Sequence, residues 1–172
     1  MSEKILLRAA LCFPVKRRQI LLAYKTKGIG KGFWNGYGGG IEDGETPVIA
    51  ARRELGEEAK IFAVTRYFRK KAVVDFHNTT SDGTEFTCRV HVYLVSDWDG
   101  VPRSTKEMID PTWFLKKDLP VDKMAPADRE WLPEILKGKT IFAEAWLGPF
   151  QRTLLKDVVI REATVEELEA LI

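Results

Sequence analysis

The stretch "GGGIEDGETPVIAARRELGEEAKI", residues 38–61, places three glycines ahead of an acidic run with helical periodicity. Thr46 suits an N-cap and Pro47 suits the first helical position. Apolar residues then recur at the spacing of a single helix face, at Val48, Ala51, Leu55 and Ala59. The stretch therefore predicts a helix over residues 47–59, entered from a glycine-rich loop.

Three glutamates crowd one face of this predicted helix. Glu54, Glu57 and Glu58 stand at positions i, i+3 and i+4, so their carboxylates converge and repel by a few tenths of a kcal/mol per pair. A hard divalent cation would reverse the sign of that interaction, and Mg²⁺ prefers carboxylate oxygens together with substrate phosphates. The alternative is an ordinary solvated acidic face, which an E-x-x-E-E run alone does not exclude.

The residues around the acids favour the metal site. The chain reads Gly39, five residues, Glu45, seven residues, then Arg53-Glu54-Leu55, one residue, and Glu57-Glu58. This spacing resembles the signature of the Nudix hydrolases, G-x5-E-x7-R-E-U-x-E-E-x-G-U, where U is aliphatic. Lys60 stands at the family's last glycine. Because glycine there usually adopts positive φ, which costs lysine about 1 kcal/mol, we expect an altered turn without lost catalysis.

The resemblance implies an α+β fold, the Nudix α/β/α sandwich with a mixed sheet, as one domain over residues 1–172 with the signature at 39–61. It also implies Mg²⁺-dependent hydrolysis, with Mn²⁺ as a possible substitute. The family's substrates are nucleoside diphosphates linked to another group, and water attacks a phosphorus of the pyrophosphate bridge. Charge neutralisation and a positioned nucleophile are what this chemistry needs.

By the match, the catalytic residues are Glu45, Arg53, Glu54, Glu57 and Glu58. The three helix glutamates are implied as metal ligands, and Glu54 is the most plausible alternative general base. An ion pair from Arg53 to Glu45 would hold the arginine at the start of the helix.

Two further metal contacts are implied outside the helix. The carbonyl of Gly38 is an expected backbone ligand, and Glu107 in "KEM" aligns with a further metal-linked glutamate. The glycine loop around Gly39 brings backbone groups to a metal or a phosphate.

The segment "LLAYKTKGIGKGFWNGYGG" resembles a branch of the family that hydrolyses oxidised purine nucleoside triphosphates. That resemblance implies Asn35 as a base contact and Lys25 and Gly39 as substrate contacts. An amide suits a purine edge because it both donates and accepts. A turn-forming Asn-Gly pair is the alternative reading of Asn35.

The segment "MAPADREW" departs from that branch, which places a tryptophan and two adjacent acids here against the base. This chain has Ala125 and Ala127 instead, and only Asp128 remains in register. Base stacking on an aromatic ring is worth about 1–3 kcal/mol, so we expect altered or relaxed base discrimination. A protonated Asp128 with a raised pKa could still donate to the base, and Trp131 suits core packing better than stacking.

Composition excludes several classes of protein. The 172 residues carry a net charge of +2, which argues against a nucleic-acid binder. We expect the basic clusters 16–18 and 69–71 to be solvated loops. Cys12 and Cys88 are interpreted as reduced, packed thiols, and His77 and His91 lack the neighbours of a zinc site. No apolar run reaches membrane-spanning length, and the N-terminus does not resemble a signal peptide, so a cytoplasmic monomer is expected.

The remaining pattern predicts strands mixed with few helices. Strands are expected over residues 5–13, 19–25, 61–68, 71–77, 85–98 and 112–120, with a helix over 127–138 and a hairpin over 140–162 around Pro149. Thr164 and Glu167 form a capping box for a last helix. Without regular strand–helix alternation, a mixed sheet flanked by helices is favoured.

Three functional hypotheses follow. The first is Mg²⁺-dependent hydrolysis of oxidised purine nucleoside triphosphates such as 8-oxo-dGTP to the monophosphate and pyrophosphate, which cleans the nucleotide pool and prevents DNA damage. The second keeps the chemistry but changes the substrate to ordinary dNTPs, a nucleoside diphosphate sugar or an RNA 5′ end. The third is a non-catalytic binding module, and the intact acidic cluster argues against it. A prenyl-diphosphate isomerase is disfavoured because neither cysteine forms a motif with the acids.

Overall fold

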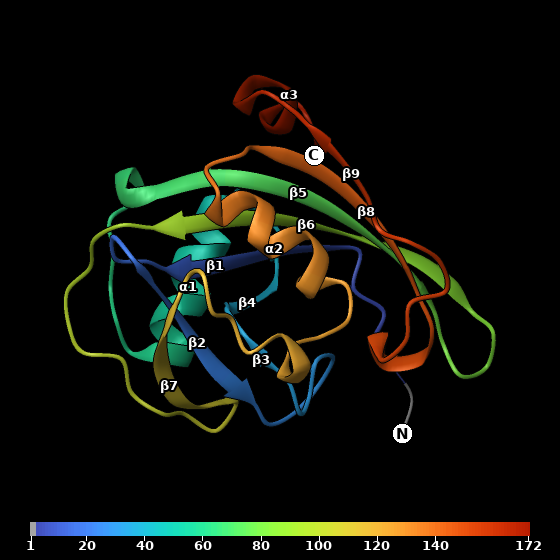
Figure 1. Ribbon diagram of the computed structural model, residues 1–172, viewed down its shortest axis with the longest axis horizontal. Helices are drawn as coiled ribbons and strands as arrows, with labels where there is room; N and C mark the ends of the chain where they lie inside the picture. The colour runs from blue at the N-terminus through green and yellow to red at the C-terminus, as the bar shows by residue number, and fades with distance from the viewer. Residues whose placement is uncertain (1–2) are drawn as a thin grey trace.

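The computed structural model describes residues 3–172, which form two β-sheets and three α-helices. The six-stranded sheet has the order β4-β1-β6-β5-β8-β9, with strands Tyr37–Gly40, Arg8–Pro14, Glu85–Val95, Phe68–Thr79, Ile141–Leu147 and Val159–Glu162. The three-stranded sheet has the order β3-β2-β7, with strands Trp34–Asn35, Gln19–Lys25 and Met108–Leu115. In Figure 1 the strands β5 and β8 arch over the upper part of the molecule, and the smaller sheet lies below.

The large sheet is mixed, as the sequence predicts. Strand β1 runs parallel to β6 and antiparallel to β4. Strand β5 runs antiparallel to β6 and parallel to β8, and β8 pairs with β9 in the antiparallel sense. The segment over 140–162 thus closes as the expected antiparallel pair.

The two longer helices cover different faces of the sheets. Helix α1 (Pro47–Ala59) buries Ala51 and Leu55 in an apolar cluster with Cys12 and Tyr93. Helix α2 (Asp128–Leu136) buries Trp131 in a second cluster that includes strands β5, β6 and β8. The helix–sheet–helix layering confirms the predicted α/β/α sandwich with a mixed sheet (Figure 1).

Helix α1 has the predicted bounds, and its start has the predicted chemistry. The Thr46 Oγ1 accepts a hydrogen bond from the Ile49 N–H at 3.4 Å, and Pro47 opens the helix. At the other end our expectation of an altered turn is wrong. Lys60 adopts the left-handed conformation with φ 58° and ψ 32°, so the lysine keeps the turn that glycine usually makes.

Several predictions from the pattern are corrected by the structure. Residues 61–68 form a short 3-10 turn at Thr65–Tyr67 instead of a strand. The cluster Arg69–Lys71 lies within β5 and is not a solvated loop. The buried Lys70 Nζ lies 3.6 Å from a carboxylate oxygen of Glu169, which gives the charge a partner. Lys71, which is also buried, donates from its Nζ to the Gly138 carbonyl at 3.0 Å.

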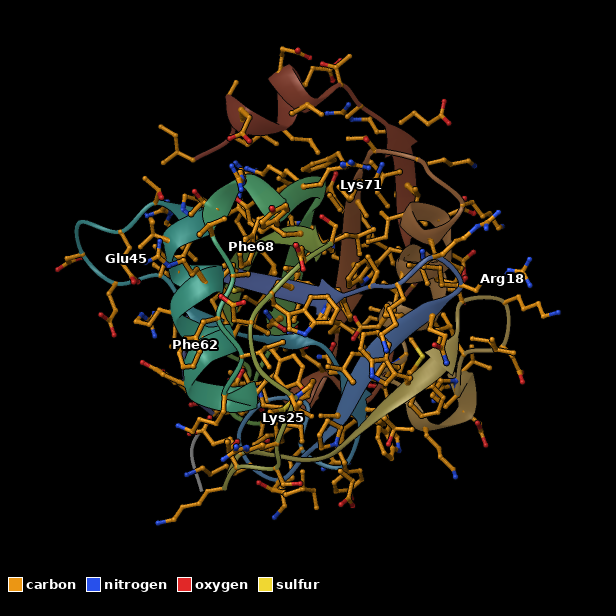
Figure 2. All side chains as sticks on the ribbon, turned by 90° about the vertical axis from the view of Figure 1, so that its left-hand side faces the viewer. Arg18, Lys25, Glu45, Phe62, Phe68 and Lys71 are labelled. Atoms are coloured by element: carbon orange, nitrogen blue, oxygen red, sulfur yellow. The ribbon has the colours of Figure 1, made fainter. Side chains whose placement is uncertain are left out.

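The remaining predictions agree more closely with the structure. Residues 16–18 form an exposed turn between β1 and β2, and Arg18 extends from it in Figure 2. Thr164 caps the short helix α3 (Val165–Glu169) by accepting from the Glu167 N–H. Cys12 and Cys88 are buried free thiols. Within residues 3–172, none of the helices combines the length and the apolar character that crossing a bilayer requires.

Candidate active site

Arg53 organises the acidic end of helix α1. Its Nε and one terminal nitrogen donate to the two oxygens of Glu45, at 2.8 and 3.0 Å, and the same nitrogen donates to the Gly40 carbonyl at 3.0 Å. The other terminal nitrogen donates to Glu54 at 2.8 Å and to Glu57 at 3.4 Å. The fork of the guanidinium thus holds the loop before α1, where Glu45 lies in Figure 2, against the helix.

This network explains the pKa of Glu45. The hydrogen bonds from Arg53 favour the ionised carboxylate and lower the pKa of Glu45, with a smaller contribution from the Glu42 N–H. The predicted ion pair between Glu45 and Arg53 is therefore confirmed.

Glu58 lies at the inner end of the acidic cluster. Its side chain is buried, and one carboxylate oxygen accepts the Gly38 N–H at 2.8 Å. Burial raises the pKa of Glu58 to about 7, and the charges of Glu54 and Glu107 add to the rise. Lys25 and the Gly38 N–H act in the opposite direction without cancelling it. The raised pKa means that the ionised form of Glu58 is destabilised in the folded protein, and a cation bound nearby would stabilise it.

The glycines of β4 let the backbone approach these acids. A Cβ on Gly38 would lie 2.2 Å from the Ala10 carbonyl oxygen, and one on Gly39 would lie 2.4 Å from a carboxylate oxygen of Glu54. Any side chain at Gly39 would therefore occupy the space beside Glu54. Glycine is required at Gly38 because the main chain packs directly against that of β1, and a side chain at Gly39 would displace the Glu54 carboxylate.

The three helix glutamates do not converge on a single point. Glu57 is exposed and directed toward Arg53, whereas Glu58 is turned beneath β4. Among residues 3–172, no three imidazole, thiol or carboxylate side chains lie close enough together to enclose a metal ion. Arg53 holds the carboxylates of Glu54 and Glu57, and the Gly38 N–H holds that of Glu58, so their joint role as metal ligands stays a prediction.

Glu107 approaches the same cluster from the loop before β7. The Thr105 hydroxyl of this loop donates to the Glu58 carbonyl at 2.9 Å, and the Glu107 carbonyl accepts the Thr26 N–H at 2.9 Å. Its exposed carboxylate lies 3.6 Å from the Lys27 Nζ. The charge of Glu107 raises the pKa of both Glu54 and Glu58, so the loop places a fourth acid beside them.

The donor set of this cluster fits a hard divalent cation. It consists of carboxylate oxygens, with the Gly38 backbone in direct contact with one of them. The charge of Glu107 raises the pKa values of Glu54 and Glu58, and the charge of Glu54 also raises that of Glu58; a cation would relieve this repulsion.

A cavity of about 130 Å³ opens next to the acidic cluster. Its lining includes every residue that the sequence proposes for substrate binding, and also Gly38: these are Lys25, Asn35, Gly38, Gly39 and Asp128. They come from β2, the segment around β3 and β4, and the start of α2. Because Gly38 and Gly39 also contact Glu58 and Glu54, the cavity and the acids form one continuous site.

Asp128 is a buried acid in the cavity wall. Burial raises the pKa of Asp128 to about 7, although the Trp131 Nε1–H donates to its Oδ1 at 3.0 Å and Lys25 lies nearby. The carboxyl therefore holds its proton over part of the neutral range and can then donate to a ligand. Trp131 is fully buried, which confirms its predicted place in the core.

Lys25 links the two ends of the site. Its charge lowers the pKa of Glu58 and also that of Asp128, although it is not the main cause of either pKa. In Figure 2 it lies on β2, away from the loop that carries Glu45. The positive charge of Lys25 thus acts on both the acidic helix and the cavity wall.

Asn35 makes the hydrogen bond expected of a turn and still keeps donors for a ligand. Its Oδ1 accepts the Gly36 N–H at 2.7 Å, as in a local Asn-Gly turn. The Nδ2 keeps its two N–H groups, and the residue lines the cavity. The two readings of Asn35 are therefore compatible.

Two amides in the cavity wall, Asn78 and Gln151, were missed by the sequence analysis. Asn78 had a signal, because it follows Val74 and Phe76 at strand alternation and so belongs to the buried face of β5. Gln151 had none, since it lies in the irregular segment around Pro149 that joins β8 to β9.

The comparisons with known proteins agree with this geometry. The family model described as "NUDIX domain" matches residues 6–135. The chain is 32% identical over 129 residues to an oxidized purine nucleoside triphosphate hydrolase of Mus musculus, covering 75% of this chain and 79% of that protein. Its identity to the protein of the same name from Danio rerio is 33% over 129 residues, with the same coverage.

Solved structures resemble the fold. A MutT protein from Bacillus halodurans has a TM-score of 0.73 at 21% identity, covering 90% of this chain and 97% of that one. A MutT NUDIX hydrolase from Burkholderia pseudomallei has a TM-score of 0.58 at 26% identity, covering 68% and 88%.

Proposed function

Because the chain belongs to the NUDIX domain family, we propose that it hydrolyses purine nucleoside triphosphates, with 8-oxo-dGTP as the leading substrate. Water and the triphosphate give the monophosphate and pyrophosphate, in a reaction that depends on Mg²⁺. Mn²⁺ is a plausible substitute, because it is also a hard cation that accepts carboxylate ligands. The biological role would be removal of oxidised nucleotides from the pool before they enter DNA.

The observation that carries this proposal is the position of Lys25. It lines the cavity and lowers the pKa of acids at both ends of the site, Glu58 and Asp128. A nucleoside triphosphate needs a cation between its base and the carboxylates that surround its reacting phosphates. Lys25 provides that charge in a cavity whose other walls are glycine backbone, amides, apolar side chains and the Asp128 carboxyl.

The protein's own groups divide the work along the site. Lys25 neutralises phosphate oxygens, and the backbone at Gly38 and Gly39 leaves room for them beside Glu54. Arg53 fixes the Glu54 carboxylate through a 2.8 Å hydrogen bond, so this group is oriented before substrate arrives. Glu45 fixes Arg53 in turn, which makes both of them positioning residues.

The part of the cavity around Asn35 and Asp128, which we call the base end, recognises the purine through hydrogen bonds. The Asn35 Nδ2 donates, and Asp128 donates when protonated or accepts when ionised. Ala125 brings no aromatic ring to its part of the cavity wall, where Phe76 is the aromatic lining residue, so we assign the discrimination between bases to the polar groups.

Glu54, Glu57, Glu58 and Glu107 are the residues that would hold the divalent cation, together with the Gly38 carbonyl. When bound, the cation supplies charge neutralisation at the phosphates and lowers the pKa of bound water.

A substrate panel tests the proposal. The protein is incubated with Mg²⁺ and, separately, 8-oxo-dGTP, dGTP, dATP, ADP-ribose and a 5′-triphosphorylated RNA, and release of pyrophosphate and phosphate is followed. We expect pyrophosphate from 8-oxo-dGTP at a higher kcat/KM than from any other compound, and none when EDTA replaces Mg²⁺.

The same panel separates the alternatives. Faster cleavage of ADP-ribose or of the RNA end would overturn the substrate assignment and keep the hydrolytic chemistry. Binding without turnover of any compound would overturn the enzymatic proposal in favour of a binding module.

A further inference from the structure

Asn78 and Gln151 form a hydrogen-bonded pair of amides in the cavity wall. Asn78 is almost fully buried on β5, and its Nδ2 donates to the Phe76 carbonyl at 2.9 Å. Because a backbone carbonyl only accepts, this bond fixes which end of the Asn78 amide faces which way. The Asn78 Oδ1 therefore faces Gln151 and accepts a hydrogen bond from its Nε2 at 2.9 Å.

That bond leaves the Gln151 amide with one N–H and its carbonyl oxygen unused by other side chains. Among residues 3–172, the Asn78 bond is the only hydrogen bond that the Gln151 side chain makes. The residue is half-buried and lines the cavity. It thus presents a donor beside an acceptor, in an orientation set by Asn78.

The backbone under Gln151 is held in an unfavourable conformation. Phe150 and Gln151 have φ values of 56° and 58°, so two consecutive residues with side chains occupy the left-handed region. The Gln151 N–H donates to the Gly148 carbonyl at 3.0 Å, which closes the turn. Non-glycine residues held in this region often mark functional positions, and here the conformation brings the glutamine amide into the cavity.

The rest of the cavity leaves a role for such an amide. Ala125 contributes no ring or polar side chain to the wall, and Asn35 uses its oxygen on its own turn. Asp128 is the only carboxyl among the residues that line it. Gln151 offers a donor and an acceptor side by side in this wall without depending on pH.

The chemistry of the purine selects which base this amide favours. Guanine presents two acceptors, N7 and O6, along its major-groove edge, so an amide satisfies them poorly. Oxidation at C8 places a proton on N7, and the edge then offers a donor beside an acceptor. An amide pairs with such an edge through two hydrogen bonds.

We propose that Gln151, oriented by Asn78, is a specificity-determining residue that pairs with the N7 and O6 edge of 8-oxoguanine in this cavity. The assignment rests on the proposed function, since it places a purine nucleotide in the site. It assigns base discrimination to the β8–β9 connection, in addition to the residues around Asn35 and Asp128.

The test compares Gln151→Gly with Phe150→Gly. Both variants relieve the left-handed conformation, so neither is expected to unfold, and only the first removes the amide. We expect the ratio of kcat/KM for 8-oxo-dGTP over dGTP to fall about tenfold in Gln151→Gly, the discrimination typical of a two-bond amide–base contact. The ratio should stay at the wild-type value in Phe150→Gly. An unchanged ratio in Gln151→Gly, or an equal fall in both variants, would overturn the assignment.

Binding of the monophosphates keeps this test separate from catalysis. Calorimetric titration with 8-oxo-dGMP and dGMP, without metal, should show the same loss of preference in Gln151→Gly alone. If the wild type releases no pyrophosphate, the proposed function fails, and the monophosphate preference still decides the role of Gln151. If turnover is present and the preference does not depend on Gln151, only the present assignment fails.

Discussion

The acidic end and the base end of the site are built in different ways. The acidic end is mostly local: Glu45, Arg53 and Glu54 lie within ten residues, and one guanidinium ties them together. The base end is assembled from β2, β5, the start of α2 and the β8–β9 connection, which are distant in the chain. The difference suggests that hydrolytic chemistry and base choice can be altered separately.

The largest expected effect is loss of turnover at the acidic end. Replacing the exposed Glu57 by glutamine keeps its shape and removes a charge, so we expect kcat to fall by roughly 10³-fold with little change in unfolding. Glu42→Gln is the matched control, because Glu42 is also exposed and lies 3.9 Å from the same Arg53. Steady-state rates on 8-oxo-dGTP compare the two variants. Full activity in Glu57→Gln would show that Glu57 is not a metal ligand.

The next effect concerns how the acidic end is held together. Arg53→Ala removes the partner of Glu45 and Glu54 at once, and we expect it to destabilise the protein by about 3 kcal/mol and to lower kcat. Arg52→Ala, at the exposed neighbouring position, should leave the urea midpoint almost unchanged. Equal midpoints for the two variants would mean that the network around Arg53 is energetically unimportant.

A third prediction concerns the base end, where Asp128 should make the stability of the protein depend on pH. Burial raises the pKa of Asp128 to about 7, so between pH 4 and 7 the folded state keeps a proton that the unfolded chain releases. Stability therefore falls as pH rises through this window, by at most about 1.4 kcal/mol per unit, and levels off above it. The facing groups are Lys25 and the Trp131 N–H.

Asp128→Asn removes this titration and can still accept the Trp131 hydrogen bond. Urea unfolding from pH 5 to 8 should show the variant gaining stability relative to the wild type as pH rises. Parallel stability profiles would contradict the raised pKa of Asp128.

The smallest expected effect lies outside the cavity, at the C-cap of α1. Lys60 has φ 58°, so Lys60→Gly should stabilise the protein by about 1 kcal/mol, or roughly 2–4 °C in Tm, without changing kcat/KM. Thermal unfolding with an activity assay checks both parts. A lower Tm would show that the lysine side chain contributes more than its backbone conformation costs.

The acidic end could be predicted from the sequence to a greater extent than the base end. The bounds of α1, its Thr46 cap and the Arg53–Glu45 pair depend on contacts close in sequence, and the structure confirms them. The partner of Glu58 could not be predicted, because helical spacing does not show that the Gly38 N–H binds its carboxylate beneath β4.

Tertiary contacts also explain what the pattern missed. Lys70 lies buried in a strand because Glu169 from the C-terminal helix provides its partner, which no local pattern indicates. Gln151 reaches the cavity only because β8 lies beside β5 in the sheet. The cavity as a whole could not be predicted from local patterns, because its wall combines segments that are distant in the chain.

The central claim is that the carboxylates of α1 carry the chemistry and the cavity carries the choice of base. Its most direct test is Mg²⁺-dependent pyrophosphate release from 8-oxo-dGTP and dGTP, measured in one series for wild type and Glu57→Gln. The account predicts that the variant loses activity on both substrates by the same large factor, so that their kcat/KM ratio is preserved. A variant that keeps its rates, or that loses activity on only one substrate, would contradict it.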